Sequence, residues 1–198
     1  MDPTLYYKRA TAYYSVGRHA TALADFDQVL SLTSRTFEKA HLMKAKIHAK
    51  EGRWADAREA LKHYQAKNDP IARELLLDIT DGEAAARKAA QAQKAKLWTA
   101  CEESATQGLR VASHSVTLRQ QRANCALAAG DFEEAVADLR LVVVDLATPR
   151  HLSGQQSPHP DYVAVDGRVY EYFPHIILLH GFLRVKHGDG KSQAVFAL

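Results

Sequence analysis

The sequence has few cysteines and no long apolar run, and each shortage excludes a class of protein. Two cysteines, Cys101 and Cys125, are too few for a disulfide framework or a cysteine-based zinc site. Two alternatives remain for them: two ordinary buried thiols, which we favour, or one bridge in an oxidising compartment. Apolar runs such as Ile176–Leu179 are far too short to cross a bilayer, so no membrane partner is expected.

The sequence also lacks an excess of one charge and the usual marks of catalysis. Its 26 Lys and Arg residues are offset by 23 Asp and Glu residues and are spread along the chain. Nucleic-acid binding needs basic residues gathered on one face, so no nucleic-acid partner is expected. There is no Gly-rich phosphate loop, no nucleophile with an evident base and no isolated carboxylate pair. We therefore predict a protein that is not an enzyme and that uses no cofactor and no metal.

The start of the chain, MDPTLYYKRATAYY, lacks the apolar core of a secretion signal. If the chain is complete as it stands, this absence predicts a cytoplasmic protein.

What the sequence does contain is a ten-residue motif that occurs three times. It reads GRHATALADF at 17–26, GRWADAREAL at 52–61 and GDFEEAVADL at 130–139. Each copy starts with glycine, has alanine five positions later, and follows another alanine seven positions upstream. Gly17 and Gly52 are 35 residues apart. A degenerate copy, in which Lys96 replaces the glycine, precedes Gly130 by 34 residues.

A period of about 34 residues with small residues at fixed places is typical of the tetratricopeptide repeat, two antiparallel helices per unit. Glycine permits the tight turn between the two helices, and the alanines let the helices approach where they cross. We predict an all-α fold, a tetratricopeptide-repeat α-solenoid of about four helix hairpins over residues 1–149. The predicted units are 3–36, 38–71, 82–115 and 116–149.

Extra residues, Ile71–Asp81, lie between the second and third units and start directly after Pro70. Proline is unsuited to a helix interior but suits a first helical turn. This insert predicts an additional or lengthened helix that joins two pairs of repeats.

Residues 150–198 break the repeat pattern. Pro158, Pro160 and Pro174 interrupt this segment, and the stretches YVAV and RVYEYF are typical of short strands or loops. Two interpretations stay open: an irregular appendage on the last repeat, or the end of an incomplete gene product that is not part of the ancestral fold. We favour the second.

Two features of this tail resemble functional sites. His159, Pro160 and Asp161 form the tripeptide through which J-domains stimulate their heat-shock partner ATPase. The sequences on either side of the tripeptide are not typical of helices, so we interpret it as a chance match to the J-domain tripeptide. Four histidines of the tail also match no compact metal-ligand spacing. They are His159, His175, His180 and His187.

The segment DPTLYYKRATAYYSVGRHATALADFDQVLSL at 2–32 and the segment LRQQRANC at 118–125 resemble one particular family. This family comprises the tetratricopeptide-repeat DnaJ co-chaperones of the endoplasmic reticulum lumen, and the resemblance covers about 1–146. It implies that the repeats bind unfolded clients and that the clients pass to a BiP-type chaperone. It also implies a lumenal location. No J-domain is recognisable here, so ATPase stimulation is not carried over.

The family has a cysteine that Cys125 matches, and that cysteine can pair with another about ten residues earlier. Ala112 or a neighbour occupies that earlier place here, so the family's disulfide is not carried over either.

The repeat positions predict which residues face the concave groove of the solenoid. The candidates for the client-binding groove are Tyr7, Thr11, Tyr14, Leu42, Lys46, Gln120, Asn124 and Leu127, with Ala49, Ala86, Ala90 and Gln93 at corresponding places. The alternative for Tyr14 and Leu42 is packing against a neighbouring helix. The alternative function is a generic scaffold that recognises one folded partner or one linear motif.

Overall fold

The computed structural model describes residues 2–66, 69–147, 162–165 and 168–171. The chain divides into two compact units, Met1–His151 and Leu152–Leu198. The helices of the first unit are α1 (Pro3–Ser15), α2 (His19–Leu32), α3 (Glu38–Lys50), α4 (Trp54–Lys62), α5 (Pro70–Lys94), α6 (Trp98–Val111), α7 (Val116–Ala129) and α8 (Phe132–Ala147). In the second unit, β1 (Tyr162–Val165) pairs antiparallel with β2 (Arg168–Glu171), within the two stretches expected to be strands or loops.

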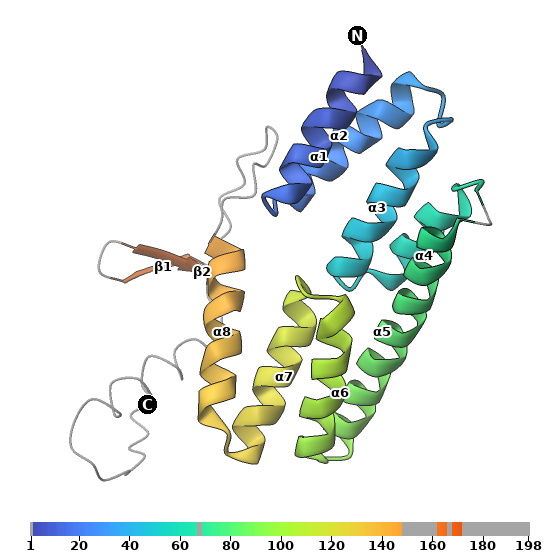
Figure 1. Cartoon of the computed structure of the whole chain (residues 1–198). Coiled ribbons are helices and arrows are strands. Elements are labelled where there is room, and N and C mark those ends of the chain that lie inside the picture. The colour runs from blue at the N-terminus through green and yellow to red at the C-terminus, as the bar shows by residue number, and fades with distance from the viewer. Residues whose placement is uncertain (1, 67–68, 148–161, 166–167, 172–198) are drawn as a thin grey trace. The chain divides into compact units, whose positions relative to one another are not determined.

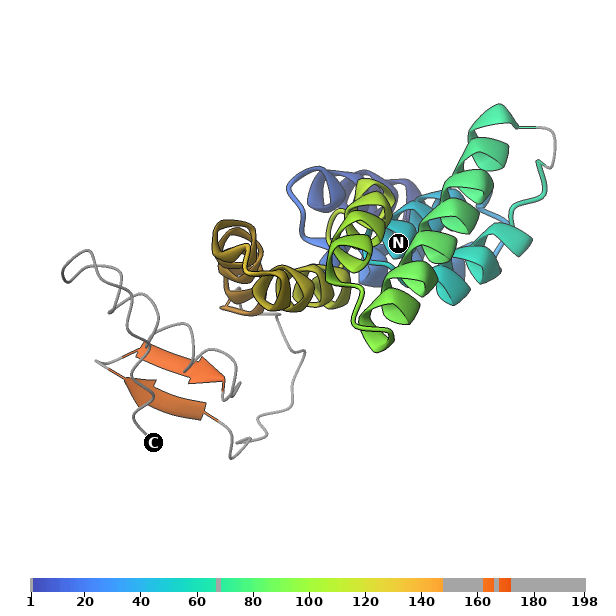
Figure 2. The same ribbon diagram turned by 90° about the horizontal axis from the view of Figure 1, so that it is seen from below.

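The helices of the first unit follow one another as packed neighbours, as the solenoid prediction requires. Figure 1 shows α1 beside α2, α6 beside α7, and α7 beside α8. Figure 2, seen from below, shows how α5 passes from α4 at one end to α6 at the other. The described part of residues 3–147 is helical, with turns between the helices. The predicted all-α class is therefore confirmed.

The same dipeptide starts the first helix and the longest one. Asp2 accepts a hydrogen bond from the Thr4 amide at 2.8 Å, and Asp69 accepts one from the Ile71 amide at 3.0 Å. The proline after each aspartate has no N–H to leave unpaired in the first turn. One continuous helix follows Asp69, so Ile71–Asp81 is the first part of a lengthened helix and not a separate one. The boundaries of the four units stay a prediction.

The turns within the hairpins have the backbone conformation expected of the repeated glycine. Gly17, Gly52 and Gly130 have φ values of 77°, 74° and 89°. Lys96, which replaces glycine in the degenerate copy, also lies in the left-handed region, with φ 58°. The degenerate copy therefore makes the same turn. Because lysine has a Cβ, the backbone is strained at this position.

The alanines of the repeat are fully buried. Those before the glycines and those after them all have 0% exposure: Ala10, Ala22, Ala45, Ala57, Ala123 and Ala135. Larger side chains fill the space beside them, as Phe26 and Val29 do between α1 and α2. The prediction that these alanines occupy the helix crossings is confirmed.

An ion pair occurs at equivalent places in the first and last hairpins. The Arg9 guanidinium donates to both Asp25 oxygens at 2.7 Å, and the Arg122 guanidinium donates to both Asp138 oxygens at 2.6 Å. In each pair the arginine stands directly before the buried alanine of the first helix. Two parallel bonds fix the geometry more tightly than a single contact does.

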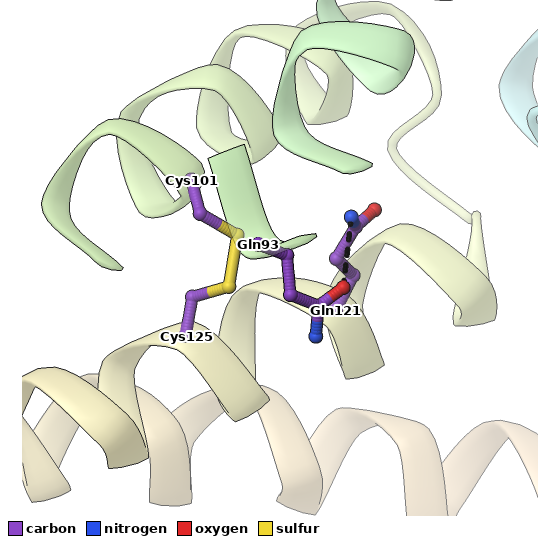
Figure 3. Close-up of a disulfide and its surroundings, with 4 residues drawn as sticks. All are labelled: Gln93, Cys101, Gln121 and Cys125. Atoms are coloured by element: carbon purple, nitrogen blue, oxygen red, sulfur yellow. Dashed lines mark hydrogen bonds between the residues drawn. A yellow bond between two sulfur atoms is a disulfide. The ribbon is translucent and has the colours of Figure 1, made fainter. Parts of the chain in front are cut away.

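The expectation of two free thiols is wrong. Cys101 on α6 and Cys125 on α7 form a disulfide with a Cα–Cα distance of 6.1 Å, and both residues are fully buried (Figure 3). Cys101 occupies the small-residue position where α6 meets its neighbours, and the inward face of α7 brings Cys125 opposite it. Beside the bridge, the Gln121 side chain donates to the Gln93 side chain at 3.2 Å, which links α7 to α5.

Two of the turn glycines provide a matched test of packing. An added Cβ at Gly17 meets nothing within 4 Å, whereas one at Gly52 lies 2.7 Å from Ser115 Oγ. Gly17→Ala is expected to cost about 1 kcal/mol, the strain of a left-handed alanine. Gly52→Ala is expected to cost about 2 to 4 kcal/mol, because overpacking adds to the same strain. Urea unfolding followed by circular dichroism measures both, and equal losses would contradict the observed contact.

Candidate client-binding surface

The predicted groove residues of the first hairpin lie on α1 and are partly built into its core. The Tyr7 ring makes an edge contact with Phe26 at 5.6 Å and a tilted contact with Phe37 at 5.0 Å between ring centroids. Burial raises the pKa of the Tyr7 phenol, and the Thr11 hydroxyl partly offsets this effect. Thr11 itself is exposed, and its hydroxyl donates to the Tyr7 carbonyl at 2.9 Å.

Tyr14 also makes definite contacts. Its ring stacks on His19 at 5.8 Å, and the Lys50 ammonium lies 5.4 Å from its centroid. A lysine over an aromatic ring gains about 0.5 to 1 kcal/mol at an exposed site. Tyr14 is also partly buried against the apolar cluster of the first helices, which agrees with helix packing, the alternative considered for it.

The other predicted residues lie on α3 and α7. Leu42 is half-buried against the apolar cluster of α3, α4 and α5, and Lys46 is half-buried one turn later. Gln120 and Asn124 are half-buried on α7, whereas Leu127 is 38% exposed. The assignment of these residues to a client-binding groove stays a prediction.

A hollow of about 880 Å³ lies elsewhere, between α2, α3 and α4. It is lined mainly by polar and charged side chains, and none of the eight predicted residues lines it. Its side chains include Asp27, Arg35, His41, Lys44, His48, Asp56, Glu59 and His63. Sequence reasoning missed this hollow, although α3 carries a polar stripe, His41, Lys44 and His48, at the spacing of one helix face.

Some of the charged and polar groups that line the hollow interact with one another. Lys44 forms an ion pair with Asp27 across the gap between α3 and α2. The rings of His41 and His63 lie 5.3 Å apart, and a His41 ring nitrogen lies 3.1 Å from the Arg35 carbonyl oxygen. Burial lowers the pKa of both His41 and His48. These imidazoles therefore resist protonation.

Within the residues that the structure describes, no group of three metal-binding side chains is found. In those residues, too, no helix is long and apolar enough to cross a membrane. His159–Asp161 and the tail histidines His175, His180 and His187 lie outside the described residues.

Paired helices, left-handed turn residues and buried alanines define a tetratricopeptide-repeat protein. The sequence profile of the tetratricopeptide repeat matches residues 3–36. The structure is also similar to the crystal structure of the P58(IPK) TPR domain, with a TM-score of 0.67 at 23% identity. That match covers 74% of this chain and 42% of the other, and it supports the fold.

Curated relatives define the kind of tetratricopeptide-repeat protein more closely. The chain is 46% identical over 153 residues to the tetratricopeptide repeat and J domain-containing co-chaperone DNJ1 of Cryptococcus neoformans. It is 40% identical over 162 residues to the co-chaperone of the same name from Fusarium oxysporum. It is 27% identical over 140 residues to rat DnaJ homolog subfamily C member 3.

These matches cover 75%, 80% and 68% of this chain but only 29%, 29% and 28% of the relatives. The chain is a homologue of these tetratricopeptide-repeat and J-domain co-chaperones, and it corresponds to their repeat portion only. The resemblance seen in the sequence is therefore confirmed for that portion.

Proposed function

We propose that the helical repeats bind unfolded polypeptide, as the client-binding part of a co-chaperone that works with an Hsp70-type partner. The observation that carries the proposal is the 46% identity to a co-chaperone over 153 residues of repeat. In this proposal the client occupies a face of α1, α3 and α7 to which the eight residues are predicted to belong. A BiP-type chaperone is then an indirect partner, since client transfer requires parts of the relatives that this match does not cover.

The mixed chemistry of this face suits weak, sequence-tolerant binding. Burying about 400 Å² of apolar client surface at about 25 cal/mol/Å² gives a gross gain of about 10 kcal/mol. Ordering a flexible client consumes much of that gain, which leaves an affinity of micromolar order. A holding chaperone needs such an affinity because it must release its client.

We also propose the endoplasmic reticulum lumen as the location. The buried Cys101–Cys125 bridge supports it, because disulfides persist in oxidising compartments and are rare in the cytosol.

Leu127 offers the cleanest test of client binding. Charge substitution at Tyr7, Tyr14 or Leu42 is also expected to weaken binding, but these residues pack against apolar clusters and their loss costs stability as well. Leu127→Asp is expected to weaken suppression of the aggregation of a denatured protein about fivefold, because about 1 kcal/mol of apolar contact is lost.

The matched control is Leu141→Asp. Leu141 is 47% exposed on α8, a second helix of its hairpin, so suppression should be unchanged. Full suppression by the Leu127 variant, measured by light scattering at equal folded content, would contradict the assignment of this face.

A scaffold that recognises one charged linear motif is the second candidate. The hollow between α2, α3 and α4 favours it, since Asp56 and Glu59 line it together with Lys44 and three histidines. A scaffold would form a saturable one-to-one complex with a single partner and would leave denatured proteins unprotected.

A further inference from the structure

The hollow between α2, α3 and α4 is lined by two buried imidazoles, which mark two places along α3. His41 and His48 are 5% and 9% exposed, and both line the hollow. At a rise of about 1.5 Å per residue, the helix places these two residues about 10 Å apart along its axis. The hollow therefore extends along α3 for at least about this length.

The two buried rings have hydrogen-bonding capacity that the fold does not use. The His41 Nε2 atom lies 3.1 Å from the Arg35 carbonyl oxygen. A carbonyl oxygen can only accept, so Nε2 carries the proton, and the Nδ1 atom of the neutral ring is left as an acceptor. The Nδ1 atom of His48 has no hydrogen-bond partner among the described residues. A bound polypeptide offers N–H and C=O groups along its length, which suits such a wall.

One unpaired charge lies near each buried ring, and the two charges have opposite signs. Burial lowers the pKa of His41, and the positive charge of Arg35 acts in the same direction. Burial and the charge of Arg53 lower the pKa of His48, whereas the Asp56 carboxylate acts to raise it. Arg35 and Asp56 both line the hollow and are exposed, and neither forms an ion pair with another described residue.

The other charged groups that line the hollow are paired. Lys44, which lies between the two imidazoles on α3, forms an ion pair with Asp27 of α2. Glu59 of α4 forms an ion pair with Lys62 at 2.7 Å. The hollow is therefore left with a free cation near one imidazole, a free anion near the other, and a neutralised pair between them.

We propose that this hollow binds an extended polypeptide segment in which an acidic and a basic residue stand three positions apart, with uncharged residues between them. Three positions of an extended chain span about 10 Å, at about 3.3 Å per residue. The acidic side chain then pairs with Arg35 and the basic one with Asp56. A free amino acid does not meet this requirement, because its two charges are attached to one carbon.

This inference rests on the second candidate function, recognition of a linear motif, and specifies the motif. The hollow has a volume of about 880 Å³, which is within the range of ligand sites in proteins. None of the eight residues predicted for the client-binding groove lines it. Binding of unfolded clients and binding of the motif can therefore be tested separately.

The test is a nuclear magnetic resonance titration of the isotope-labelled full chain with the peptide acetyl-Ser-Glu-Thr-Val-Lys-Ser-amide. The β-branched residues between the two charges favour an extended peptide. Saturable shifts are expected for the backbone amides of α3 and α4. Replacing the peptide's glutamate by glutamine, or its lysine by glutamine, should each weaken binding about threefold to fivefold, because one exposed ion pair is lost.

Variants of the chain assign each charge of the peptide to its partner. In Arg35→Gln, replacing the peptide's glutamate should no longer matter, whereas replacing its lysine should still weaken binding. Asp56→Asn should show the reverse. The matched controls are Arg73→Gln and Asp81→Asn, which remove exposed charges of α5 outside the hollow and should retain both responses.

Three results would overturn the inference. The first is the absence of saturable binding by this peptide. The second is an undiminished response to glutamate replacement in the Arg35→Gln variant, and the third is a set of shifts confined to α1 and α7. Suppression of aggregation by Arg35→Gln and Asp56→Asn should equal that of the native chain, so a failure of the motif leaves the proposed client binding intact.

Discussion

Replacing Arg122 by methionine is expected to lower the free energy of unfolding by about 3 to 5 kcal/mol. The Asp138 side chain is 1% exposed and receives two N–H bonds from Arg122 at 2.6 Å. Arg122 also donates to Thr106 at 3.1 Å and lies 3.1 Å from Glu134. The variant leaves a buried carboxylate without its counter-ion, and the cost of that desolvated charge dominates the effect.

Arg9→Met is the matched control. Arg9 pairs with Asp25 in the same bidentate geometry, but its side chain is 55% exposed against 17% for Arg122. The Asp25 side chain is 10% exposed, but water screens the pair from the Arg9 side, so the expected loss is clearly smaller than that of the Arg122 variant. Urea unfolding monitored by far-ultraviolet circular dichroism measures both variants. Equal losses would show that burial of Asp138 does not set the strength of its pair.

Removing the disulfide is expected to have the second-largest effect. The Cys101–Cys125 bridge closes a loop with a sequence separation of 24, for which loop-closure entropy predicts about 3 kcal/mol of stabilisation. The double variant Cys101→Ala, Cys125→Ala should lose about that amount. The loss comes mainly from the greater freedom of the unfolded chain.

A thiol reductant separates the bridge from other effects of the substitution. It should lower the urea midpoint of the native chain and leave the double variant unchanged. A native chain whose midpoint is insensitive to reductant after full unfolding and refolding would contradict a stabilising bridge.

The turns and helix crossings could be predicted from the sequence because their causes are local or strictly periodic. Gly17 and Gly130 mark positive φ, and Ala22 and Ala135 mark contacts that admit no larger side chain. Lys96 shows that the period matters more than the residue. It makes the left-handed turn without being glycine, because the helices on either side hold it there.

Pairings between distant residues were not predictable in the same way. Cys101 stands five positions after Lys96, where the other copies of the repeat have alanine, and this position predicts a helix crossing but not the partner of the cysteine. Burial of both sulfurs on adjacent helices was the missing information. For Tyr7, the repeat position predicts a groove, whereas contacts with Phe26 and Phe37 make the residue part of the core edge.

By itself, the sequence determined that the chain folds as stacked helix hairpins, because glycine at the turns and alanine at the crossings act within each unit. The sequence also determined the homology to co-chaperone repeats, because homology is recognised from the order of the residues. Only the tertiary structure decided that Cys101 meets Cys125 and that His19 meets His114. Those contacts depend on how successive hairpins are rotated relative to one another. These rotations are small and add up over many residues, so no repeated sequence pattern predicts them.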